Sequence, residues 1–240
     1  MTMQKAGIKN IIIDIPVHHY GKLEKDKIFT KGEDYYILGK LKLSERGEKD
    51  FIALYELAVQ ASELERFDEA LGYWKKLSEV KPDFPKAYFG LANSYYRQSK
   101  FQEAIDSLET ALKLEKNPEE RREFIPLYAA CSICIGKAEK CISLLKDTLS
   151  KYPELPMVVL MLALVYCCIN KKDDAKKYLS LLKKRMTYDN YLYEFAEFLI
   201  KAGNLNYAIS IIETALDTGT QDERFPILLD RCEKLLTEEN

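Results

Sequence analysis

The residues best suited to chemistry are four cysteines that fall into two pairs. Cys131 and Cys134 are three positions apart on one expected helix, and Cys167 and Cys168 lie on a later one. Four thiolates held close together can bind Zn²⁺ tetrahedrally. Neighbouring helical positions point in different directions, however, so this spacing does not bring all four thiols together. The pattern favours small core thiols, and we expect no metal site and no cofactor.

No catalytic constellation accompanies these cysteines. The sequence has no nucleophile–base pair, phosphate-binding loop or paired carboxylates at a spacing that suggests a reaction. The types and positions of the polar residues therefore favour a binding protein over an enzyme.

Composition and charge narrow the class of partner. The 240 residues include 36 basic and 38 acidic side chains, so the formal charge is −2 and gives no reason to expect nucleic acid. The most apolar stretch, Met157–Ile169, is too short to span a bilayer. Asp14 interrupts the short apolar run Ile11–Ile13, unlike the core of a signal peptide. We expect a soluble, cytoplasmic protein that binds neither membrane nor nucleic acid.

Internal periodicity is the strongest signal in the sequence. One series of alanines is separated by 34, 37, 34 and 33 residues: Ala58, Ala92, Ala129, Ala163 and Ala196. A second series lies 12 positions later and shows the same separations: Ala70, Ala104, Cys141, Ala175 and Ala208. Two small-residue series in step predict pairs of short helices that cross closely at these positions.

The flanking residues complete a pattern that resembles the tetratricopeptide repeat. Pro82 and Pro153 end their units. A large apolar residue directly precedes each alanine of the first series: Leu57, Leu91, Tyr128, Leu162 and Phe195. The resemblance covers about residues 51–222. It implies an all-α solenoid, a right-handed superhelix of helix–turn–helix units whose usual role is to hold protein partners.

The repeat divides the chain into expected segments. The five units are 51–84, 85–118, 122–155, 156–188 and 189–222. The longer separation places an insertion near Glu119–Arg121, which should lengthen the first helix of the third unit. A capping helix is expected over 223–240, a charged helical linker over 22–48, and a short strand within 1–21.

The start of the chain carries a second resemblance. The run from Ile13 through His18, His19, Tyr20 and Gly21, followed by a Lys-rich helix, is similar to the junction between the catalytic domain and the repeats of family 2 glycosyltransferases. It implies an alternative function, as the acceptor-binding or dimerising tail of such an enzyme. The chain lacks that family's Asp-x-Asp motif, so we favour His18 and His19 as ordinary loop residues. An unpaired strand here would also suit a homodimer.

The tetratricopeptide resemblance also implies where a partner would lie, because the first helix of each unit lines the concave face. The expected groove residues are Lys86, Phe89, Asn93, Tyr96, Arg97, Leu127, Ala130, Met157, Leu160, Met161 and Leu164. The middle of this groove is apolar and rich in methionine, which suits an amphipathic or apolar peptide segment. Alternatively, tight superhelical curvature or the chain's own N-terminal segment covers these residues.

Overall fold

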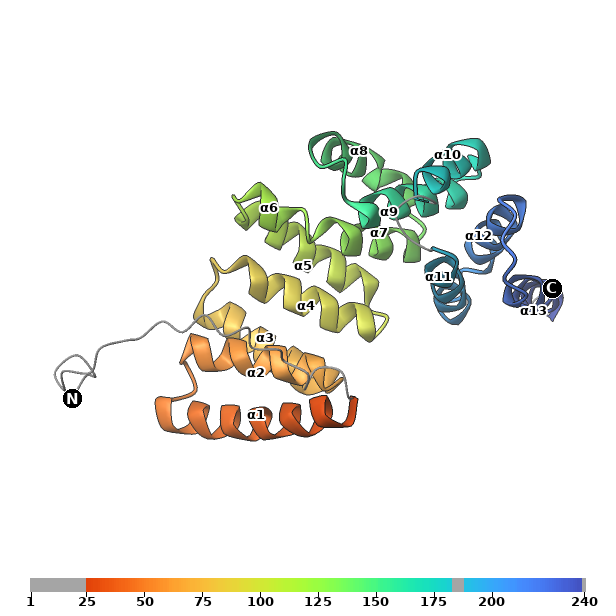
Figure 1. Ribbon diagram of the computed structural model, residues 1–240. Coiled ribbons are helices and arrows are strands. Elements are labelled where there is room, and N and C mark those ends of the chain that lie inside the picture. Colours follow the sequence, from red (N-terminus) through yellow and green to blue (C-terminus); the bar gives the residue numbers. More distant parts are fainter. Residues whose placement is uncertain (1–24, 183–187, 239–240) are drawn as a thin grey trace, which may run out of the picture.

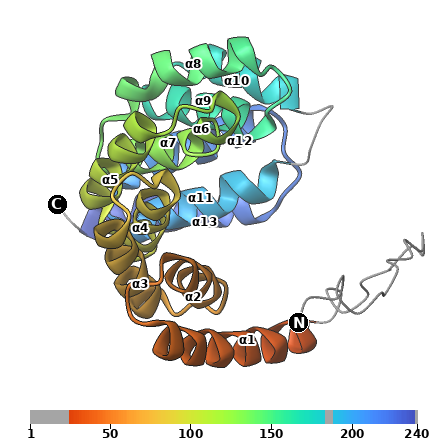
Figure 2. The ribbon, with the colours of Figure 1, turned by 90° about the vertical axis from the view of Figure 1, so that its left-hand side faces the viewer.

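The chain folds into a row of antiparallel helix pairs that curves back on itself (Figures 1 and 2). The structure, a computed structural model, describes residues 25–182 and 188–238. These residues form helices joined by short turns and include no strand. Within the same ranges, no helix is both long and apolar enough to cross a membrane. The strand expected within residues 1–21 lies outside the described residues.

The helices have the following bounds: α1 Lys25–Arg46, α2 Phe51–Glu63, α3 Phe67–Val80, α4 Pro85–Arg97, α5 Phe101–Leu114, α6 Pro118–Arg121, α7 Ile125–Cys134, α8 Ile142–Lys151, α9 Pro156–Cys168, α10 Lys172–Leu182, α11 Asp189–Lys201, α12 Leu205–Asp217 and α13 Arg224–Glu238. A short 3-10 helix, Ala138–Cys141, precedes α8. The pairs α2/α3, α4/α5, α7/α8, α9/α10 and α11/α12 are called units one to five below.

Each unit turns between its two helices through one residue in the left-handed conformation. These residues have φ between 57° and 77° and recur at the alanine spacing: Glu65, Ser99, Gly136, Asn170 and Gly203. The residue after each of them donates its backbone N–H to the carbonyl five positions earlier, at 2.8–2.9 Å. This pattern satisfies the last free carbonyls of the first helix and reverses the chain within a few residues.

The small residues of both series lie where helices pack most closely. All nine alanines and Cys141 are fully buried. They belong to two hydrophobic clusters, one formed by α1, unit one and the start of unit two, and the other by the rest of the array with α13. Because helices this short are marginal alone, neighbouring units stabilise one another through these contacts.

The insertion does not lengthen the first helix of unit three, as the sequence suggested. It forms the separate single turn α6, which begins at Pro118, and three residues then lead into α7. Pro126 in the first turn of α7 explains the break. Proline has no N–H to bond the carbonyl of Arg122, and its ring would clash with that carbonyl in a continuous helix.

A helix covers each end of the array. Within the stretch expected to be a linker, α1 packs against α2, and its Tyr36 is 1% exposed. Gly32 and Gly39 permit the close approach, since a Cβ atom there would lie 3.0 Å from Leu64 and 2.9 Å from Leu57. At the other end α13 packs on α12 and α11.

Candidate functional site: an aromatic groove in the first three units

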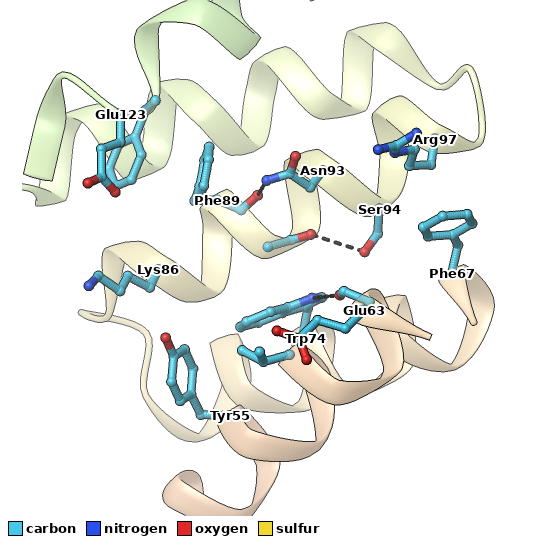
Figure 3. Close-up of a pocket in the computed structure, with 14 residues that line it drawn as sticks. Tyr55, Glu63, Phe67, Trp74, Lys86, Phe89, Asn93, Ser94, Arg97 and Glu123 are labelled. Carbon is cyan, nitrogen blue, oxygen red and sulfur yellow. Dashed lines mark hydrogen bonds between the residues drawn. The ribbon is translucent and has the colours of Figure 1, made fainter. Parts of the chain in front are cut away.

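A groove of about 370 Å³ lies where units one, two and three meet (Figure 3). This volume is within the range of ordinary ligand sites. Its lining comes from α2, α3, α4 and the residues just before α7: Tyr55, Val59, Ser62, Glu63, Phe67, Trp74, Lys86, Phe89, Gly90, Asn93, Ser94, Arg97, Glu123 and Phe124. The groove therefore depends on the stacking of successive units.

The floor of the groove is the contact between Trp74 and Gly90. A Cβ atom on Gly90 would lie 2.2 Å from the indole ring, so only glycine lets α4 approach α3 this closely. The indole Nε1 donates to Ser62 Oγ at 3.3 Å, and Ser94 Oγ donates to the Gly90 carbonyl at 3.0 Å. These bonds satisfy the polar groups of the floor and hold the indole in place.

Aromatic side chains form the walls. The Tyr55 ring meets the Trp74 ring edge-on, with centroids 5.8 Å apart. Across the groove, Phe89 stacks on Phe124 at 4.8 Å. Tyr55 and Phe89 are only half-buried, so both rings still offer apolar surface to a ligand. Offset and edge-on pairs of this kind stabilise both partners and keep the walls rigid.

Charged groups mark the two ends of the groove. At one end Lys86 Nζ is 2.9 Å from Glu120 Oε2, and the contact with this carboxylate raises the pKa of Lys86. Glu123 lies at the same end (Figure 3). At the other end the Arg97 guanidinium lies 5.6 Å from the Phe67 ring centroid and forms no ion pair with a described residue. A carboxylate could therefore approach Arg97 without displacing an existing partner.

Four of the expected groove residues line this groove: Lys86, Phe89, Asn93 and Arg97. Tyr96 does not, since its ring packs against Phe198 of unit five, 5.0 Å between centroids. Leu127 is half-buried and Ala130 is 7% exposed within the core.

The methionine-rich middle of the expected groove lies inside the protein. Leu160, Met161 and Leu164 are buried, at 1%, 7% and 1% exposed, and Met157 is half-buried. A partner cannot reach the three buried side chains in this conformation. Packing of α12 on α9 covers this helix, as tight curvature of the array would require. The other alternative, the N-terminal segment of the chain, lies outside the described residues.

Unit five closes the curve (Figure 2). Phe198 on α11 packs against Tyr96 and also against Phe101, at 5.7 Å between centroids. Asn204 Nδ2 donates to the Cys134 carbonyl at 2.9 Å, and α12 packs on α9. Units two and five thus touch directly, although about a hundred residues separate them in sequence.

The repeat pattern predicted only four of the fourteen residues that line the groove. Phe67, Trp74 and Phe124 come from positions that the pattern treats as packing residues or turns. Tyr55 occupies the position of unit one that is equivalent to Phe89 of unit two, 34 residues later. Gly90 was the available signal, because a glycine inside a helix often marks a close approach. It sits directly beside Trp74.

The cysteines are all buried thiols. Burial raises the pKa of Cys131 to about 12 and that of Cys141 to about 11, so both thiols stay protonated at neutral pH. Within residues 25–182 and 188–238, no group of three or more His, Cys, Asp or Glu residues is placed to hold a metal ion.

Comparison with known proteins identifies the repeat. The family model of the tetratricopeptide repeat matches residues 49–120. Anaphase-promoting complex subunit CDC16 of Saccharomyces cerevisiae is 26% identical over 138 residues. That match covers 58% of this chain but only 16% of CDC16, so it relates a set of repeats and not a whole protein.

Solved structures show the same architecture. YrrB, described as a tetratricopeptide-repeat protein with an unusual peptide-binding site, has a TM-score of 0.55 and 16% identity over 81% of this chain and 97% of its own. PilW, a type IV pilus biogenesis factor, has a TM-score of 0.61 and 18% identity over 89% of this chain and 100% of its own. At these identities the likeness establishes the fold, and the expected all-α tetratricopeptide solenoid is confirmed.

The glycosyltransferase resemblance is not among these findings. Its strand, with His18 and His19, lies outside the described residues. The Lys-rich part that follows is α1, which packs on unit one as the first helix of the array.

Proposed function

We propose that this chain, a tetratricopeptide-repeat solenoid, holds a partner protein by an extended peptide segment laid in the groove of units one to three. The observation that supports this most is the aromatic lining of a groove whose floor is already fixed by Trp74 and Gly90. A preformed groove costs little ordering on binding, so its apolar contacts contribute to affinity. The function is that of a scaffold without catalysis, and the partner is a protein.

The length and chemistry of the groove suggest what the segment looks like. Lys86 and Arg97 are eleven residues apart on α4, a span of about 16 Å at the helical rise. An extended chain covers that distance with about five residues. One large apolar side chain would pack between Tyr55 and Phe89, over Trp74. An acidic group would lie beside Arg97, and a basic group beside Glu123.

Trp74 makes the test direct, because it is the only tryptophan in the chain. Random twelve-residue peptides displayed on phage would be selected on the wild-type protein, with counter-selection on Phe89→Glu. Selected peptides made synthetically should shift the Trp74 emission, and Phe89→Glu should weaken their binding by about tenfold or more, since a charge would replace the apolar wall.

The matched control is Ile227→Glu, which places the same charge at a 71% exposed position on α13, far from the groove. This variant should bind the selected peptides like the wild type. If selection enriches no sequence over the Phe89→Glu background, or if Ile227→Glu weakens binding equally, the groove is not the binding site.

A further inference from the structure

A second hollow, of about 380 Å³, lies between units two and three and shares no lining residue with the peptide groove. Basic side chains from three different elements line it: Lys113 of α5, Arg121 of α6 and Lys140 of the 3-10 helix. Glu109 and Tyr128 complete its polar lining. The hollow therefore collects three positive charges in a chain whose net charge is −2.

These three cations are unpaired within the part of the chain that the structure describes. None of Lys113, Arg121 and Lys140 forms an ion pair with any residue that the structure describes, whereas other basic residues, such as Lys86 and Arg122, do. The one carboxylate in the lining, Glu109, accepts a long hydrogen bond of 3.4 Å from the Tyr128 hydroxyl. The lining thus carries a formal charge of +2, and an anion bound there would relieve the repulsion among the cations.

The irregularity of the repeat creates this hollow. The separation of 37 residues between Ala92 and Ala129, against 34 between Ala58 and Ala92, marks the insertion that forms α6. Arg121 is the last residue of α6 and lines the hollow together with residues of the regular helices. The basic hollow is therefore specific to the junction of units two and three.

We propose that this hollow binds a phosphoryl group. A phosphate dianion matches the formal charge of the lining, and a carboxylate would neutralise only half of it. Its oxygens can accept two parallel hydrogen bonds from the Arg121 guanidinium and further bonds from the two lysines. Buried Leu112 and half-buried Leu144 add apolar surface beside the cations. The phosphoryl group belongs either to a phosphorylated side chain of a partner protein or to a small phosphorylated molecule.

The test is calorimetric titration of the full chain with inorganic phosphate at constant ionic strength. Arg121→Gln and Lys140→Gln should each weaken phosphate binding by about tenfold, since each removes a charge-assisted hydrogen bond. Lys177→Gln is the matched control, because Lys177 is exposed on α10 and lines neither hollow. It should bind phosphate like the wild type. Phe89→Glu should also bind phosphate normally, which separates this proposal from the peptide groove.

Two further titrations identify the source of the phosphoryl group. A phosphoserine peptide that binds much more tightly than phosphate, while its glutamate analogue does not, would point to a phosphorylated partner. If phosphate and pyrophosphate bind as tightly as the phosphoserine peptide does, the phosphoryl group belongs to a small molecule. The proposal fails if the wild type binds no phosphate, if acetate binds equally well, or if Lys177→Gln loses as much affinity as Arg121→Gln.

Discussion

The hairpin turns show how one backbone requirement is met by different residues. Each unit needs a left-handed residue between its helices, and the chain uses glycine twice, asparagine once, and Glu65 and Ser99 in the remaining two. A side chain with a Cβ atom pays a steric cost in this conformation that glycine avoids. Units one and two therefore carry strain that units three and five do not.

Ser99→Gly should stabilise the protein by about 1 kcal/mol, because Ser99 has a φ of 58° and is exposed. The free energy of unfolding in urea measures this directly. Ser99→Ala is the control and should change the stability little, since alanine keeps the Cβ atom. Gly136→Ser should show the opposite sign in unit three. A loss of stability in Ser99→Gly would contradict the strain at this turn.

Two glycines on neighbouring helices should respond oppositely to the same substitution. Gly90→Ala should destabilise the protein by about 1–3 kcal/mol, because the added Cβ atom meets the Trp74 ring. Gly72→Ala in α3 should stabilise it by up to about 1 kcal/mol, since the new methyl group meets no atom of a neighbouring side chain or helix within 4 Å. Thermal unfolding of the two variants, with Trp74 emission recorded for Gly90→Ala, gives the comparison. Equal shifts in both would refute the close packing at Gly90.

At the scale of helices, the sequence predicts the helix pairs, because their positions depend on the local spacing of small residues. The alanine series locates the five pairs because each unit repeats the same close contact at the same interval. The break between α6 and α7 was missed because the insertion was counted as helix, although Pro126 inside the following helix indicated a boundary. The docking of α1 depends on Gly32, Tyr36 and Gly39 meeting unit one, a contact that the repeat pattern does not contain.

Tyr36 makes a polar contact that joins α1 to α3. Its hydroxyl donates to Glu69 Oε2 at 2.5 Å, and Lys40 Nζ lies 3.1 Å from the same oxygen. These contacts lower the pKa of the Glu69 carboxyl, the Tyr36 hydrogen bond most of all. A carboxyl whose pKa is lower in the folded state stabilises the fold above its unfolded pKa of about 4.3. That contribution is lost as the pH falls through the folded pKa.

Tyr36→Phe should therefore raise the pKa of Glu69 and weaken the acid dependence of stability. The carboxyl carbon of Glu69 can be followed by NMR between about pH 2 and pH 6, across its unfolded pKa. Unfolding free energies at the same pH values should fall less steeply on acidification in the variant than in the wild type. Tyr35→Phe on the exposed face of α1 is the control. An unchanged Glu69 titration in Tyr36→Phe would show that this hydrogen bond does not set the pKa.

At the scale of the whole molecule, curvature decides which surface a partner can reach. The middle of the concave face was predicted from the sequence as an apolar groove, yet its residues on α9 are buried and α12 of unit five packs on that helix. Each unit is rotated slightly relative to the one before it, and these rotations add up along the array. The sequence pattern of one unit does not reveal the total rotation, so it does not predict that the curve closes. The groove of units one to three escapes this closure because it lies before the point where unit five returns.

Phe198 should hold the curve closed, because its ring packs against both Tyr96 and Phe101 of unit two. Phe198→Ala should let units two and five separate and expose the thiols of Cys134 and Cys168, which are 5% and 9% exposed. Burial raises the pKa of both thiols, so in the closed form they react slowly with a disulfide reagent near neutral pH. In the variant the disulfide reagent should modify these two cysteines faster than in the wild type, and mass spectrometry of the labelled peptides measures the rate.

Loss of stability alone could also speed thiol modification, so the comparison needs a variant that is destabilised elsewhere. Tyr55→Ala removes an aromatic side chain that packs on Trp74 and Phe84, away from the contacts of Phe198. If closure depends on Phe198, Cys134 and Cys168 react faster in Phe198→Ala than in Tyr55→Ala under conditions where both remain folded. Equal rates would mean that the contacts between α12 and α9 keep the array closed without Phe198.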